Sequence, residues 1–314
     1  MPVYRLILKK ALTLTSRHPL LWLLGVLAVL SGSSDVSLWL QFTRLEQTPG
    51  FFSDLAVEFF SNANTVLNWQ ILKAAAAQPL NLIISLLILV LEILLVALLA
   101  WLVIVGLNTL VVTVISLAKN KPKQLKTDLR FSISKFWPVF TVVVGTEIIF
   151  WFLTLLISTL AIFFLKLPSL IIIAAIVLLP IVIIVSFLAK YALFQLLLLG
   201  QTLKNSFALA WRLFKDNWLI SLEFALLLFG LTWLATVVVD NIFKTSLFYL
   251  ISALYTLPKT SLAITNLIFF LFELAQIIIL VFYWTSWILF FEYLTTKKVA
   301  TSRLVLGLEK IFVK

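Results

Sequence analysis

The fold of this chain is decided by the residues from Pro79 to Ala118, which read PLNLIISLLILVLEILLVALLAWLVIVGLNTLVVTVISLA. Glu92 is the only charged residue among them. A helix of this length extends about 60 Å, twice the roughly 30 Å thickness of the hydrocarbon layer of a bilayer. The stretch therefore predicts an integral membrane protein. It either crosses the membrane once and bends near Gly106, or crosses it twice.

The composition of the whole chain supports the same class. Of its 314 residues, 63% are apolar and 12% are charged, whereas an average soluble domain has roughly 45–50% apolar and about 25% charged residues. Too few polar side chains remain to cover a water-exposed surface, which excludes soluble enzyme folds. Five further apolar stretches are candidate crossings: 19–40, 137–165, 168–189, 218–239 and 261–293.

The positions of Lys and Arg decide how often the chain crosses. With one crossing for each of the six stretches, all but five of the 24 Lys and Arg residues fall on one side. A second crossing within 79–118 would move the most basic loop, 119–135, to the other side, against the tendency of basic loops to stay cytoplasmic. We therefore predict six crossings with both termini in the cytoplasm.

The lack of N-x-[ST] sequons favours a prokaryotic plasma (inner) membrane.

The first candidate crossing is the shortest, because its dense apolar part covers only 20–30. Basic residues before it and small residues after it are also typical of a cleaved signal peptide. We favour a retained helix because related features recur later in the chain, where no signal peptide can exist.

Three segments of the chain share one pattern. Each begins with a stretch of mixed basic and apolar residues, reaches an aromatic residue at its end, and is followed by a predicted crossing. They read ALTLTSRHPLLW (11–22), LKTDLRFSISKFW (125–137) and LKNSFALAWRLFKDNW (203–218). In the last two, helical spacing separates an apolar stripe from the basic residues, as in helices that lie in the headgroup layer. The predicted contacts with anionic lipid are Lys126, Arg130, Lys135, Lys204, Arg212 and Lys215.

The predicted fold is all-α: a polytopic transmembrane bundle of six spanning helices, arranged as three similar hairpins with amphipathic interfacial helices. The single membrane domain divides into repeats over about 1–118, 119–200 and 201–314. The alternative is that the three segments are ordinary basic joins without a repeat. The segment 31–78 is predicted to lie outside the membrane, and its acidic residues are Asp35, Glu46, Asp54 and Glu58.

The stretch 186–230, SFLAKYALFQLLLLGQTLKNSFALAWRLFKDNWLISLEFALLLFG, resembles a module of poorly characterised prokaryotic membrane proteins. Their nearest named relative is the membrane domain attached to some glycerophosphodiester phosphodiesterases. The stretch HPLLWLLGVLAVLSG (18–32) is similar to the start of the same group. The resemblance implies a six-helix bundle with amphipathic joins. It implies no catalytic residue, because the catalytic residues of that family lie in a soluble domain that we do not find in this sequence.

Composition also removes several kinds of chemistry. The chain has no Cys, a single His (His18) and no glycine-rich nucleotide-binding motif. We therefore predict no catalytic residue, no metal site and no cofactor. The net charge of +11 comes from basic residues in short loops beside apolar stretches, so the expected partner is a bilayer with anionic headgroups and not nucleic acid.

Four glutamates lie within the predicted crossings, where an ionisable side chain is costly and normally faces protein or water. They are Glu92, Glu147, Glu223 and Glu273. No basic residue is expected in the helix cores, since Lys190 is placed at a helix end. One interpretation is a proton or cation path through the bundle. The alternative is neutral glutamates that hydrogen-bond to residues such as Thr141 or Thr232 on neighbouring helices.

The predicted function is therefore non-enzymatic. The chain is expected to organise lipid, a partner membrane protein or a second copy of itself through its basic interfacial helices. A proton- or cation-linked transporter or channel that uses the four glutamates is the first alternative. A lipid-modifying enzyme that uses the acids of segment 31–78 is the second alternative.

Overall fold

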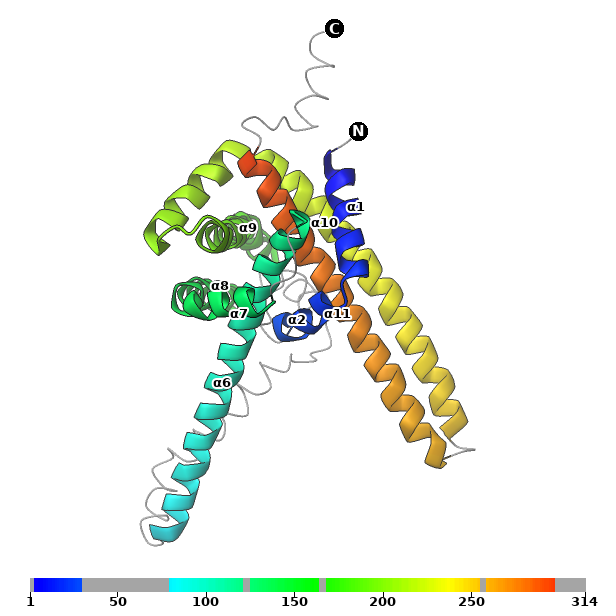
Figure 1. Ribbon diagram of the computed structural model, residues 1–314. Helices are drawn as coiled ribbons and strands as arrows, with labels where there is room; N and C mark the ends of the chain where they lie inside the picture. Colours follow the sequence, from blue (N-terminus) through cyan, green and yellow to red (C-terminus); the bar gives the residue numbers. More distant parts are fainter. Residues whose placement is uncertain (1–2, 30–78, 121–124, 164–167, 255–257, 297–314) are drawn as a thin grey trace.

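The computed structural model describes residues 3–29, 79–120, 125–163, 168–254 and 258–296. These residues form helices joined by short turns and include no strand (Figure 1). The helices are α1 (Val3–Arg17), α2 (Leu20–Val29), α6 (Pro79–Ala118), α7 (Leu125–Ser134), α8 (Phe136–Phe163), α9 (Pro168–Leu198), α10 (Leu203–Leu254) and α11 (Pro258–Thr296). The prediction of an all-helical chain is confirmed for these residues.

Five of the described helices contain a segment long and apolar enough to cross a membrane, as in a multi-pass membrane protein. The segments are Leu86–Ala118, Phe136–Leu153, Pro180–Leu198, Leu203–Ser246 and Leu267–Thr296. The first predicted crossing is described only over the ten residues of α2. Its remainder and the acids of segment 31–78 lie outside the described residues. Six crossings in three hairpins therefore stay a prediction.

Three crossing helices extend beyond their predicted bounds, α11 by only three residues at each end. α9 continues past Ala189 to Leu198, because the residues that follow are also apolar. α10 joins the predicted interfacial segment 203–218 to the predicted crossing without a loop. Its direction changes at Asn217, whose backbone is not helical (φ −132°, ψ 22°).

Most buried side chains gather at one end of the molecule, which we call the hub. The hub consists of α1, α2 and α7 with parts of five long helices: α6 from Val103, α8 up to Val143, α9 from Phe187, α10 up to Leu228 and α11 from Leu280. Aromatic rings fill its centre. Phe224 stacks on Phe290 with ring centres 4.1 Å apart, and Trp287 meets Phe224 edge-on at 5.4 Å.

Two glycines allow α2 to fit between α6 and α11. Gly25 of α2 faces Val281 and Ile277 of α11, and Gly106 of α6 faces Leu27 of α2. A Cβ atom at either glycine would overlap these neighbours. The helices therefore approach more closely than a larger residue would permit, as is common where membrane helices pack.

Beyond the hub, the long helices diverge as three arms (Figure 1). The N-terminal part of α6 forms one arm, and α10 packed on α11 forms the second. α8 packed on α9 forms the third and is seen end-on in Figure 1. The arm surfaces are apolar and exposed, for example over Ile83–Leu98 of α6. Such surfaces match the acyl chains of a bilayer, which are as apolar as leucine.

Candidate lipid-facing surface and intramembrane acids

The short helix α7 turns its apolar stripe away from the protein. The predicted stripe is Leu125, Leu129, Ile133 and Phe136. The first three are 37%, 40% and 43% exposed, whereas Phe136 begins α8 and packs on the core. Asp128 and Ser132 are buried instead. This burial pattern fits a helix whose apolar side enters the lipid while another side rests on the bundle.

Polar contacts attach α7 to α6. Thr113 Oγ1 donates a hydrogen bond to Asp128 Oδ2 at 3.2 Å, and Asn108 Nδ2 donates to the carbonyl oxygen of Ser132 at 3.4 Å. Sequence reasoning missed this polar face. The available signal was the spacing of four between Asp128 and Ser132, which places both on one side of the helix.

The first part of α10, residues 203–216, shows the same division. Ser206 and Ala210 are fully buried, whereas Phe207 and Trp211 are 39% and 51% exposed. The predicted apolar stripe of this segment, Leu203, Phe207, Ala210, Trp211 and Phe214, is therefore split. Leu203, Ala210 and Phe214 pack on the core, whereas Phe207 and Trp211 point outward. The outward residues present apolar surface close to exposed basic side chains.

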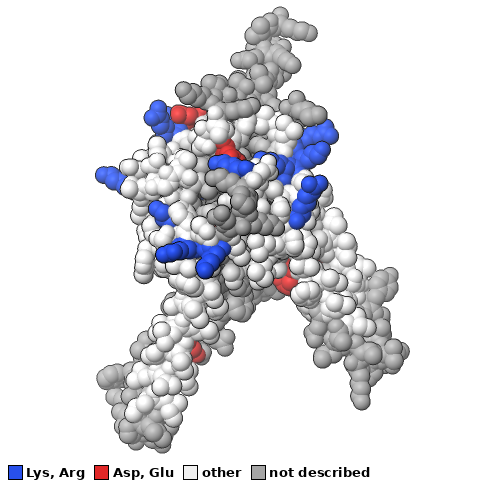
Figure 2. All heavy atoms as spheres, in the orientation of Figure 1, with Lys and Arg blue, Asp and Glu red and all other residues white. Residues whose placement is uncertain are grey.

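The six predicted lipid-contacting basic residues all belong to these two helical segments or to the turn after α7. Five of them are exposed and Lys135 is half-buried; the exposed ones are Lys126, Arg130, Lys204, Arg212 and Lys215. Figure 2 shows Lys and Arg side chains spread over the hub, while the arms on this face are nearly free of them. The hub is therefore the basic end of the molecule.

The four predicted intramembrane glutamates lie in different surroundings. Glu92 lies on the α6 arm, and Glu273 is exposed on the α10–α11 arm. Glu223 accepts a hydrogen bond from the Tyr4 hydroxyl at 2.7 Å, so it connects α10 to α1. Glu147 lines a cavity beside α9. The described residues contain no group of three or more His, Cys, Asp or Glu that could hold a metal ion.

Sequence reasoning missed a fifth acid, Asp240, on the α10–α11 arm. The predicted crossing stopped at residue 239, whereas the apolar segment of α10 continues to Ser246. Gln276 Nε2 donates to Asp240 Oδ1 at 3.2 Å, which joins α11 to α10.

Thr141 and Thr232 do not show the suggested interhelical bonds, because each donates to a carbonyl of its own helix.

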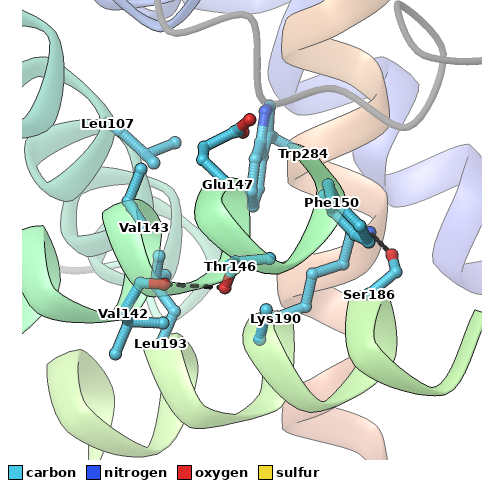
Figure 3. A pocket seen from close by; sticks show the side chains of 11 residues that line it. Leu107, Val142, Val143, Thr146, Glu147, Phe150, Ser186, Lys190, Leu193 and Trp284 are labelled. Atoms are coloured by element: carbon cyan, nitrogen blue, oxygen red, sulfur yellow. Dashed lines mark hydrogen bonds between the residues drawn. The ribbon is translucent and has the colours of Figure 1, made fainter. Parts of the chain in front are cut away.

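Glu147 shares a cavity of about 50 Å³ with Lys190, and the cavity is lined by residues of α6, α8, α9 and α11 (Figure 3). The prediction that Lys190 lies at a helix end is wrong. Because α9 continues to Leu198, Lys190 lies inside an apolar segment, and it is only 6% exposed.

Aromatic and hydroxyl groups surround the Lys190 ammonium. Its Nζ atom donates to Ser186 Oγ at 2.8 Å and lies 5.3 Å from the ring centre of Trp287 and 5.9 Å from that of Tyr283. Aromatic faces stabilise a cation that has lost its water. In Figure 3, the Glu147 carboxylate lies beside the Trp284 ring, whereas the Lys190 amine turns toward Ser186.

Comparisons with known proteins found no relative. No protein-family model matches the chain, and neither a curated protein nor a solved structure matches it. The resemblance to the membrane domain of glycerophosphodiester phosphodiesterases therefore remains a sequence-based expectation. The function has to be argued from the residues of this molecule.

Proposed function

We propose that this multi-pass membrane protein organises anionic lipid at one membrane surface through its basic interfacial helices. The supporting observation is the burial pattern of α7. Its exposed Leu125, Leu129 and Ile133 offer an apolar edge to the acyl layer, while the neighbouring Lys126 and Arg130 offer charge to the phosphates. A helix that combines these two features binds the interface by apolar burial and by attraction to anionic headgroups.

The polar attachment of α7 prepares this surface before lipid binds. An isolated amphipathic helix of ten residues would be marginal in water and would order only on the membrane. Here the bonds from Thr113 and Asn108 hold the helix against α6. Less conformational entropy is then lost on binding lipid, so the same contacts give higher affinity.

The proposal places the hub at the cytoplasmic surface of a plasma (inner) membrane. Basic residues gather at the hub, and cytoplasmic segments carry the excess of Lys and Arg. α1 packs on α11 at the hub, which supports a cytoplasmic position for both termini. Anionic lipids of that leaflet attract each nearby basic residue by about 1 kcal/mol.

Charge removal from α7 tests the proposal. The purified chain is placed in nanodiscs of phosphatidylcholine with or without phosphatidylglycerol, and thermal unfolding is followed. We expect phosphatidylglycerol to raise the unfolding temperature of the wild type. Arg130→Gln should reduce this gain, and the triple variant Lys126→Gln/Arg130→Gln/Lys135→Gln should abolish most of it.

Lys244→Gln is the matched control, because Lys244 is an exposed basic residue on the α10–α11 arm. It should keep the wild-type response to phosphatidylglycerol. Unfolding in pure phosphatidylcholine checks that every variant is folded. An equal response of the triple variant and the Lys244→Gln control to anionic lipid would contradict the proposal.

The cavity with Glu147 and Lys190 favours a proton-linked function as the second candidate. An acid and a base on adjacent helices within crossing segments are more typical of proton relays than of lipid-facing scaffolds. The enzyme alternative has no comparable support, because Asp35, Glu46, Asp54 and Glu58 lie outside the described residues.

A further inference from the structure

The cavity beside α8 and α9 is lined by both an acid and a base within the apolar part of the molecule. Glu147 belongs to the segment Phe136–Leu153, and Lys190 belongs to the segment Pro180–Leu198. The two helices pack side by side. Because ionisable side chains are costly in a membrane, such a pairing marks a functional site by default.

The size of the cavity decides what it holds. Its volume is about 50 Å³, whereas one buried water needs roughly 10–15 Å³ and small-molecule sites usually occupy at least about 300 Å³. The cavity therefore accommodates a few water molecules. It is too small for an amino acid or a lipid headgroup.

The cavity wall also offers the polar groups that buried water requires. Trp284 is 3% exposed, and its indole N–H has no hydrogen-bond partner among the described residues. A buried donor of this kind destabilises the fold unless an acceptor satisfies it. Water in the cavity would satisfy this donor, and the Glu147 carboxylate lies beside the same ring (Figure 3).

We propose that this cavity is a hydrated proton-binding site in which water connects Glu147 to Lys190. The Lys190 ammonium releases a proton to the water chain, and the water chain delivers a proton to the Glu147 carboxylate. The charged pair becomes a neutral acid and a neutral amine, and water is regenerated. Because the net charge of the cavity stays at zero, the apolar surroundings do not oppose this step.

The titratable groups on the neighbouring helices make contacts of their own. On α9, the hydroxyl group of Tyr191 is hydrogen-bonded to Ser221 of α10 at 2.6 Å. On α11, Tyr283 presents its ring to Lys190. The part of α6 that lines the cavity contributes Leu107. Exchange of this proton with either surface would supply one step of proton-linked transport, independently of the lipid function proposed above.

Infrared difference spectroscopy on the purified full-length chain in phosphatidylcholine vesicles tests the proposal. A protonated carboxyl group has a separate C=O band, and its shift in D₂O reports contact with exchangeable water. We expect a pH-dependent band that shifts in D₂O and disappears in Glu147→Gln. Lys190→Met should change the pH at which the band appears, and Trp284→Phe should reduce its D₂O shift.

Glu273→Gln is the matched control, because Glu273 is an intramembrane acid outside the cavity. It should leave the band unchanged. If a single variant fails to fold, Glu147→Gln/Lys190→Met restores a neutral cavity and should fold without the band. A band that persists without Glu147, or a midpoint that does not respond to Lys190→Met, would overturn the proposal, as would the absence of any such band in the wild type.

Discussion

The hub and the arms contain parts of the same helices, yet different contacts define them. α10 shows the contrast within one helix: Phe224 is fully buried in the hub, whereas Leu226 is 63% exposed and Leu234 on the arm is 58% exposed. In a bilayer, a leucine gains little by leaving lipid for protein. The hub is instead held by stacked aromatic rings, close glycine contacts and polar bonds. Specific packing, and not apolar character, therefore determines where these helices join.

The largest expected effect comes from emptying the aromatic centre of the hub. Phe224→Ala removes the ring that stacks on Phe290 and should lower the free energy of unfolding by about 3–5 kcal/mol. Leu226→Ala, two residues away and exposed, should change it by less than about 0.5 kcal/mol. Unfolding by SDS in mixed micelles measures both, and similar losses for the two variants would remove the distinction between hub and lipid-facing surface.

A smaller loss is expected where a glycine permits close approach. Gly106→Ala places a methyl group against Leu27 of α2 and should cost about 1–3 kcal/mol. At Gly230 an added Cβ meets no neighbour within 4 Å, so Gly230→Ala should be neutral or stabilising by about 0.5–1 kcal/mol, as expected for alanine in a helix. The same micelle titration compares the two, and a stabilising Gly106→Ala would show that α2 is not fixed in this way.

The hydrogen bond between α1 and α10 is expected to contribute about 1 kcal/mol. Tyr4→Phe keeps the ring, which lies 6.0 Å from that of Phe224, and removes only the donor to Glu223. Hydrogen exchange should become faster over α1 while the centre of the hub stays protected. Glu223→Gln retains an acceptor and should change exchange less. Unaltered exchange in Tyr4→Phe would mean that this hydrogen bond does not hold α1 in place.

The smallest expected effect on stability concerns the surface pair Arg212–Asp216. The Arg212 Nε atom lies 3.9 Å from the Asp216 carboxylate, and the side chains are 78% and 61% exposed. Arg212→Gln should therefore change the free energy of unfolding by less than about 0.5 kcal/mol in neutral lipid. The same variant should lose part of the thermal stabilisation by phosphatidylglycerol. If phosphatidylglycerol raises the unfolding temperature of Arg212→Gln as much as that of the wild type, Arg212 contacts Asp216 but does not contribute to lipid binding.

The sequence by itself determined the helical class, the location of the long helices and the basic end of the molecule. The reason is that hydrocarbon offers no partner for backbone N–H and C=O groups, so a long apolar stretch must form its own hydrogen bonds as a helix. The apolar stretch 79–118 matches α6 at both ends, although α6 is one helix across Gly106, where a bend was predicted for a single crossing. The clusters of Lys and Arg between apolar stretches likewise predicted where charge gathers on the surface.

Only the tertiary structure decided which side of each helix meets protein. In α9 and α11 nearly every side is apolar, so periodicity does not separate a protein-facing side from a lipid-facing side. The burial of Lys190, the bond from Gln276 to Asp240 and the polar attachment of α7 depend on residues that are distant in sequence. Steric fit and hydrogen-bond partners select these contacts, because exchanging lipid for protein releases almost no hydrophobic free energy.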